Sequence, residues 1–198
     1  MKRIIGVLLA LSLVIVCNGK TKNSNSPVPE AVDLGLPSGT LWATVNVGAI
    51  SPEECGDYFE WGAITPDDKF ADAKFDISGD SRYDAATANW GEKWRMPTIS
   101  EIQELINHCA WEWTTLNGVE GWKATSKKNG NSIFLPATGV CNNRKGTLSS
   151  LPGIIGSYWS STPTDNCDGA YCFGFSDKYF CNGGSSLNAL QAVRPVTD

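Results

Sequence analysis

One segment of the chain carries a clear helical signature, and it limits what the rest can form. Thr98 and Glu101 have the spacing of a capping box, in which each side chain satisfies a free backbone amide at the start of a helix. Apolar residues then recur at helical spacing on one face, at Ile99, Ile102, Leu105, Ile106 and Cys109. We therefore expect one core-packing helix over about 99–109, with short strands and turns elsewhere. This combination predicts an α+β fold class.

The segments that favour strands are short and separated by turn residues. Residues 40–47 alternate and favour β structure, and residues 57–62 predict a second short strand or turn. Asn129-Gly130 predicts a hairpin between 121–126 and 132–137. Further strands are expected around Tyr158-Trp159 and over 192–196, whereas residues 63–90 read as an irregular insertion.

The N-terminus has the pattern of an export signal. Lys2 and Arg3 precede an apolar run over 4–16, which is too short for a permanent membrane helix of about 20 residues. Cys17 ends this run at the position of a lipidated cysteine, so residues 1–17 predict a lipoprotein-type signal peptide. Ordinary cleavage after Gly19 is the alternative. Residues 18–31 then form a flexible tether, and a single domain follows over 32–198 in an exported, cell-envelope protein.

Charge and metal-ligand spacing narrow the function classes. A net charge of −5 argues against nucleic-acid binding, which needs clustered Lys and Arg. No Cys or His pair has zinc-ligand spacing, and the only histidine, His108, is expected at the surface end of the helix. We therefore expect no metal, no cofactor and no catalytic residue. The only membrane contact expected is through the N-terminal lipid.

Residues 164–190 have an unusual composition. Of Lys, Glu, Gln, Met and Trp they contain only Lys178, whereas Tyr, Asn, Ser and Gly are plentiful. These are the side chains of adaptable recognition surfaces. The segment therefore predicts a binding surface for a protein or glycan, with Tyr179 as its main aromatic anchor.

Alternation within this segment assigns its faces. Tyr171, Phe173 and Phe175 alternate with small residues and are expected to face the core. A turn at 175–178 would place Phe173 opposite Phe180 and Cys172 opposite Cys181, close enough for a disulfide; two separate free thiols are the alternative. The predicted contact surface comprises Asp165, Asn166, Asp168, Cys172, Gly174, Ser176, Tyr179, Cys181, Gly183, Ser185 and Asn188.

Large side chains outside this segment fit structural roles. Trp42, Trp61, Trp94 and Trp159 could form a sugar-stacking set, but packing in the core is the favoured interpretation. Arg95 and Arg194 are expected to be buried or half-buried in structural pairs with carboxylates.

Several ordered blocks of the sequence resemble one family. The blocks are 32–43, 56–62 (GDYFEWG), 94–98 (WRMPT), 134–137 (FLPA), 158–161 (YWSS) and 193–196 (VRPV). They resemble the Fibrobacter-type major paralogous domain of exported bacterial proteins, which is similar to the C-type-lectin-like and formylglycine-generating-enzyme-like fold. The resemblance covers about residues 31–198 and implies a C-type-lectin-like domain whose C-terminal strands and loops present the ligand face.

Three functions follow from the resemblance. The leading one is a ligand-binding or display domain, and some relatives of this kind are diversified by retroelements that rewrite template adenines. All residues over 164–190 except Lys178 fit codons that end in a pyrimidine, although an ordinary paralogue remains the alternative. A formylglycine-generating-type oxidoreductase would need a C-terminal cysteine pair, but Cys167, Cys172 and Cys181 do not match that motif. A calcium-dependent lectin would need Glu-Pro-Asn and Trp-Asn-Asp motifs, which the sequence lacks.

Overall fold

The computed structural model describes residues 30–141, 148–150 and 153–198. Its helices are α1 (Ala85–Trp90) and α2 (Ile99–His108). Its strands are β1 (Ala31–Asp33), β2 (Leu41–Ala43), β3 (Cys109–Leu116), β4 (Val119–Ser126), β5 (Ser132–Pro136), β6 (Val140–Cys141), β7 (Leu148–Ser150), β8 (Ile155–Pro163), β9 (Gly169–Ser176), β10 (Phe180–Ser186) and β11 (Val196–Thr197).

The described strands form small antiparallel sheets. Three sheets have three strands each, in the orders β1-β2-β11, β3-β4-β5 and β10-β9-β8, and β6 pairs with β7. The first sheet joins the two ends of the domain, because β11 pairs with β2 through Val196 and Trp42. Small antiparallel sheets with few helices agree with the expected α+β class.

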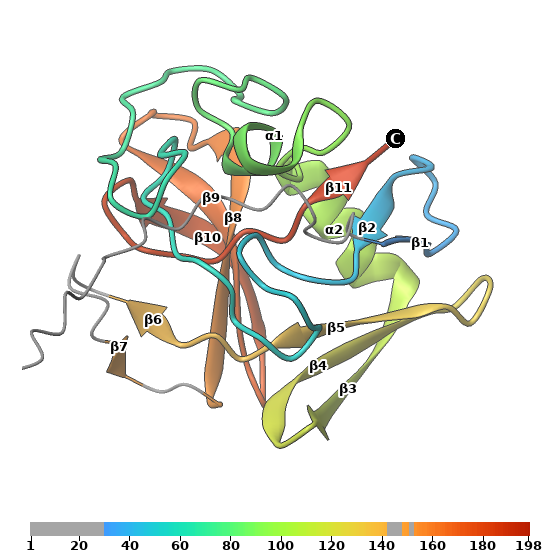
Figure 1. Ribbon diagram of the computed structural model, residues 1–198. Coiled ribbons are helices and arrows are strands. Elements are labelled where there is room, and N and C mark those ends of the chain that lie inside the picture. The colour runs from blue at the N-terminus through green and yellow to red at the C-terminus, as the bar shows by residue number, and fades with distance from the viewer. Residues whose placement is uncertain (1–29, 142–147, 151–152) are drawn as a thin grey trace, which may run out of the picture.

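Strands β8, β9 and β10 run side by side (Figure 1), and a hydrophobic core lies on each face of their sheet. On one face, Tyr158, Phe173 and Phe175 join a core to which α2, β2, β4 and β5 contribute. On the other face, Trp159 and Ala170 join a second core with residues of the segment 47–96. The middle of this sheet is therefore covered on both sides, which decides how much of β9 is available to a ligand.

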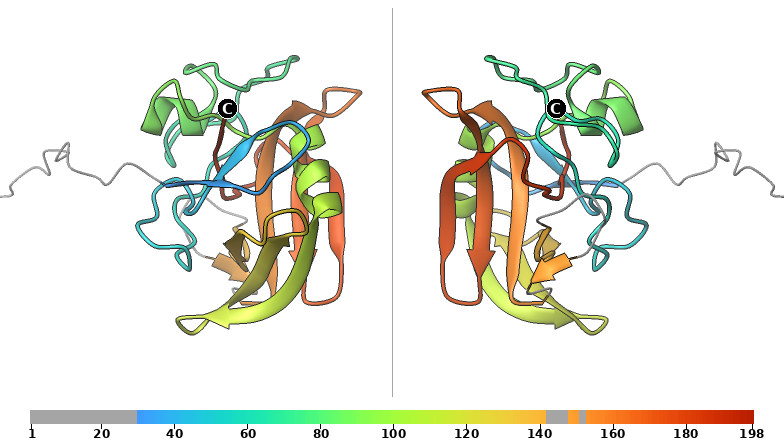
Figure 2. Two further views of the ribbon diagram at one scale, coloured as in Figure 1. Left: turned by 90° about the vertical axis from the view of Figure 1, so that its right-hand side faces the viewer. Right: turned by 90° about the vertical axis from the view of Figure 1, so that its left-hand side faces the viewer.

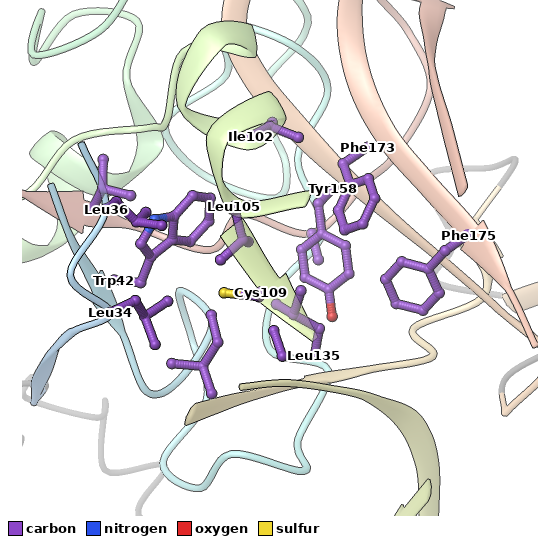
Figure 3. Close-up of a cluster of buried hydrophobic side chains, with 14 of the residues drawn as sticks. Leu34, Leu36, Trp42, Ile102, Leu105, Cys109, Leu135, Tyr158, Phe173 and Phe175 are labelled. Carbon is purple, nitrogen blue, oxygen red and sulfur yellow. The ribbon is translucent and has the colours of Figure 1, made fainter. Parts of the chain in front are cut away.

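The helix prediction is confirmed. Thr98 is the N-cap of α2, and the capping box is complete because Glu101 Oε2 also accepts from the Thr98 amide at 2.8 Å. Ile102 and Leu105 are buried, and Figure 3 shows them pointing with Cys109 into the first core. His108 is exposed at the helix end, as expected.

The four tryptophans Trp42, Trp61, Trp94 and Trp159 are all buried core residues. Each is at most 6% exposed, so none of them offers a ring face to a sugar. Two of the indoles also donate hydrogen bonds to backbone carbonyls inside the core. Trp61 Nε1 donates to the Ser160 carbonyl at 2.9 Å and Trp159 Nε1 to the Phe59 carbonyl at 2.8 Å. The core-packing interpretation is confirmed.

Two elements differ from the sequence-based expectation. The first strand of the domain is shorter than residues 40–47, since regular pairing is confined to β2. The insertion over 63–90 is mostly irregular, but it ends in α1. This helix has only six residues, too few for a periodic signal, and depends on the buried Asp84 carboxylate, which accepts hydrogen bonds from the amides of Ala86 and Thr87.

The N-terminal predictions lie outside the described residues. These are the signal peptide over 1–17, lipidation at Cys17 and most of the tether over 18–31. Ala31 of β1, which the tether prediction includes, pairs with Ala43 of β2. Neither helix in the described part of the chain is long and apolar enough to cross a membrane.

Candidate ligand-binding face

The hairpin of β9 and β10 carries most of the predicted contact surface. The Ser176 amide donates to the Tyr179 carbonyl at 3.0 Å, so the two strands are joined by a two-residue loop at Asp177-Lys178. The Ser176 hydroxyl accepts from the Lys178 amide at 3.1 Å, which is the local bond by which serine stabilises turns. The Trp122 indole on β4 donates to the Ser176 carbonyl at 2.8 Å and ties the turn to the neighbouring sheet.

The predicted register of this hairpin is wrong by two residues. Phe180 lies opposite Phe175 rather than Phe173, because the four-residue turn spans 176–179 instead of the predicted 175–178. A shift of two residues keeps every side chain on its predicted face. Phe173 and Phe175 are accordingly buried in the first core, whereas Tyr171, predicted to face the core with them, is only partly buried.

The predicted disulfide between Cys172 and Cys181 is also wrong. Cys172 lies opposite Gly183 and Cys181 opposite Gly174, and both cysteines are free thiols. Cys172 packs against the second core, and its Sγ donates to the Gly183 carbonyl at 3.4 Å. Burial raises the pKa of the Cys172 thiol to about 11, so this cysteine is protonated at neutral pH.

We expect the two thiols to differ in reactivity. After mild reduction, iodoacetamide should alkylate the exposed Cys181 at least tenfold faster than Cys172, because only the thiolate reacts and Cys172 has little of it. Mass spectrometry of the tryptic or chymotryptic peptides measures both rates. Equal rates, or a Cys172–Cys181 disulfide that forms readily in air, would contradict the register seen here.

The eleven predicted contact residues differ in exposure. Six are exposed: Asp165, Asn166, Asp168, Tyr179, Cys181 and Asn188. Four are partly buried: Cys172, Gly174, Gly183 and Ser185. Ser176 is only 6% exposed, so its assignment to the contact surface is wrong. Cys172 is partly covered because it packs against the second core.

The exposed residues gather at the two ends of the hairpin, which Figure 2 shows at opposite ends of the sheet. One end is the loop over 164–168, with Asn188 beside it, since Gly169 pairs with Ser186. The other end is the turn with Tyr179. The seven residue steps from Gly169 to Ser176 separate these ends by roughly 23 Å.

The loop over 164–168 forms what we call the polar end. The Thr164 hydroxyl donates to Asn166 Oδ1 at 2.9 Å and lies 3.3 Å from Asp168 Oδ1, which orders the loop. Lys74 Nζ donates to the Cys167 carbonyl at 2.8 Å and pairs with Asp72. The insertion over 63–90 therefore supports this loop from outside.

Two residues that contact the polar end were not predicted to lie there. Tyr171 was assigned to the core face, but it lies beside Asp165, whose negative charge raises the pKa of the Tyr171 phenol. Lys74 lies in an insertion with no regular pattern. Alternation correctly predicts that Phe173 and Phe175 face the core. No local sequence pattern, however, shows that the core ends before Tyr171.

The turn at the other end presents aromatic side chains. Tyr179 is 62% exposed at the tip. Next to it, the Phe180 ring lies 4.8 Å from Trp111 and 5.0 Å from Trp122, between ring centroids. The rings of Phe180, Trp111 and Trp122 are partly buried and pack together, which holds the β9-β10 hairpin against the β3-β4 hairpin. The Tyr179 side chain stays exposed and can contact a ligand.

Within the described part of the chain, no group of three or more His, Cys, Asp or Glu side chains is placed to hold a metal ion.

No family model matches this sequence, and neither the curated proteins nor the solved structures give a significant match.

Proposed function

We propose that the protein is an exported, lipid-anchored binding domain that recognises a protein or glycan through residues 164–190. The observation that carries the proposal is that this segment has some side chains buried in the core and others exposed at its two ends. Phe173 and Phe175 are fixed in the core, while Tyr179 and the polar end project from it. The fold is proposed to be C-type-lectin-like, a class in which C-terminal strands and loops present the ligand.

The spacing of the exposed residues favours a macromolecular ligand. The two ends lie roughly 23 Å apart, which is more than a mono- or disaccharide spans. A standard protein interface buries about 800 Å² on each partner, an area of that width. Gly174, Gly183 and Ser185 lie between the two ends and are only partly exposed, so we expect the main contacts at the ends.

The cysteines favour binding over the oxidoreductase alternative. That chemistry would need a cooperating pair of reactive thiols near the C-terminus. Cys172 and Cys181 are not paired across the strands, and the raised pKa of Cys172 lowers its thiolate fraction. Oxidation of a cysteine-containing peptide by the purified protein in the presence of copper would support the enzyme instead.

Tyr179 provides the direct test. Wild-type protein would be screened on glycan arrays with and without calcium, and against arrayed envelope proteins. For any ligand found, we expect Tyr179→Ala to weaken binding at least tenfold with an unchanged melting temperature, because an exposed aromatic anchor contributes to contact but not to packing. Ile50→Ala is the control, since Ile50 is 78% exposed and lies outside the hairpin. Equal affinity of the wild type and Tyr179→Ala for every ligand would reject the proposed face.

Diversification of the segment is a refinement that has its own test. The neighbouring DNA should contain a near-copy of the 3′ coding segment beside a reverse-transcriptase gene, with adenines where the two copies differ. The differing codons should fall at exposed positions such as Asn166 and Tyr179, and the copies should agree at Phe173 and Phe175. Without such a copy the refinement fails, but the binding proposal does not.

A further inference from the structure

A groove of about 370 Å³ lies on the sheet β3-β4-β5, on the face turned away from the first core. Ile133 and Leu135 on β5 belong to that core, so Phe134, which alternates with them, points to the opposite face. A Cβ added at Gly121 would come within 2.7 Å of the Phe134 ring, so this ring lies across Gly121. Phe134 therefore forms part of the floor of the groove.

The groove has two walls that other contacts hold in place. One wall is the segment 44–52 after β2, with Pro52 near its end, and the other is the end of β3 with Leu116. Asn117 Nδ2 donates to Glu53 Oε1 at 2.9 Å, which ties the first wall to the β3-β4 turn. Pro52 and Leu116 are only partly buried, so apolar surface remains open to solvent between the walls.

The chain enters the described domain beside this groove. The Thr44 amide donates to the Glu30 carbonyl at 3.0 Å, and Thr44 is a residue of the groove wall. At the other end of β1, the Asp33 carbonyl accepts from Asn131 Nδ2 at 2.8 Å, next to the start of β5. Followed towards the N-terminus, β1 therefore leads from the start of β5 to the groove.

The residues just before Glu30 have side chains that suit such a groove. Within 18–29, the only apolar side chains are Pro27, Val28 and Pro29. Two prolines fix φ and favour the extended polyproline form, in which three residues cover about 9 Å. Extended proline-containing segments are bound by grooves with aromatic residues. This short apolar run is therefore within reach of Phe134 and Pro52.

The hydrogen-bonding groups also match. A proline offers a carbonyl acceptor but no N–H donor, so its binding site needs donors. Lys123 lies directly opposite Phe134 and shares its face of the sheet, and no ion pair among the described residues includes it. Thr114 lies opposite Gly121 on the same face and adds a hydroxyl.

We propose that Pro27-Val28-Pro29 occupies this groove as a strap. Its apolar side chains would pack on Pro52 and Leu116, and its carbonyls would accept hydrogen bonds from donors on β3 and β4. The tether that connects the domain to its anchor would then begin before residue 27 instead of ending at residue 31. The chain would leave the domain from a fixed point on the β3-β4-β5 sheet.

The strap would leave the candidate ligand face open. The β9-β10 hairpin packs on Trp111 and Trp122 through Phe180, on the side of the β3-β4-β5 sheet that faces the first core. The groove lies on the other side of that sheet. The inference therefore does not rest on the proposed binding function, and the two can fail separately.

Val28→Asp in the full chain tests the contact. A charge in an apolar groove should displace the strap, so we expect the melting temperature to fall by about 3–6 °C. Ser26→Asp is the matched control, because it places the same charge two residues earlier, and it should change the melting temperature by no more than about 1 °C. Identical melting temperatures of the wild type and Val28→Asp would contradict the strap.

Photo-cross-linking locates the strap directly. A benzophenone amino acid in place of Val28 should cross-link within one molecule to peptides that contain Pro52 or Leu116. The same probe in place of Asn23 should show no preference for these peptides. Mass spectrometry of the digested monomer identifies the cross-links. Cross-links from position 28 that reach only other regions, that join only two separate molecules, or that do not form would each overturn the proposal.

Discussion

Replacing Glu101 with alanine should lower the free energy of unfolding by about 3–5 kcal/mol, because the change breaks a largely buried ion pair and leaves Arg95 short of its main partner. Two guanidinium nitrogens of Arg95 donate to the two carboxylate oxygens, at 2.9 and 2.6 Å. The Thr40 hydroxyl donates to the same carboxylate at 2.8 Å, and Thr98 donates to it from the helix start. Equilibrium unfolding in guanidinium chloride measures the loss.

Glu104, one turn further along α2, is the matched control. It is a glutamate on the same helix that accepts a bond from the Ser38 hydroxyl in an exposed position. Glu104→Ala should therefore cost no more than about 1 kcal/mol. Losses of similar size for the two variants would show that the network around Glu101 is not a main stabilising element.

The same network predicts a dependence on pH. Burial alone would raise the pKa of Glu101, but the hydrogen bonds from Arg95, Thr98 and Thr40 outweigh it and lower the pKa from 4.5 to about 2. Since the folded-state pKa lies below the unfolded value, this contribution is complete above about pH 4.5 and is lost as the pH falls towards 2. Between pH 5 and 2 the wild type should lose about 3 kcal/mol more than Glu101→Ala.

The elements predicted well from the sequence are those with local signals. The Thr98–Glu101 capping box spans three residues and fixes the start of α2 wherever the helix packs. The hairpin of β4 and β5 likewise follows from Asn129-Gly130 between two apolar runs. Both signals lie within one short stretch of chain, so no distant contact is needed to recognise them.

The register of the β9-β10 hairpin shows what local signals cannot decide. Two turns that differ by one residue give the same faces for every side chain, so alternation does not distinguish them. The bond from the Trp122 indole to the Ser176 carbonyl favours the observed turn, and it joins residues 54 positions apart. No pattern within 164–190 contains that information.

The partner of Arg194 and the exposure of Cys172 were missed for the same reason. The buried Arg194 has Asn46 as its partner instead of a carboxylate: Nε donates to Asn46 Oδ1 at 2.7 Å across 148 positions of sequence, and an amide is no obvious partner for a buried cation. Cys172 was assigned to solvent because strands with one apolar face usually have one core. Here the second core, built from residues of the segment 47–96, covers the other face of the sheet.

Trp159→Ala should be similarly damaging, with a loss of about 3–5 kcal/mol and a melting temperature lower by about 10 °C or more. The Trp159 side chain is fully buried in the second core, where its removal leaves a cavity next to Phe59 and Ala170. The change also removes the hydrogen bond from the Trp159 indole to the Phe59 carbonyl. Thermal unfolding followed by near-ultraviolet circular dichroism measures the shift.

Tyr179→Ala is the matched control for this prediction, because it removes an exposed aromatic ring from the hairpin that pairs with the strand of Trp159. Its unfolding free energy should stay within about 0.5 kcal/mol of the wild type. If Trp159→Ala were as stable as Tyr179→Ala, the indole would not be a core residue and a role in ligand stacking would reopen. If the two variants separate as expected, a loss of binding in Tyr179→Ala reports on contact alone, since the scaffold beneath it is intact.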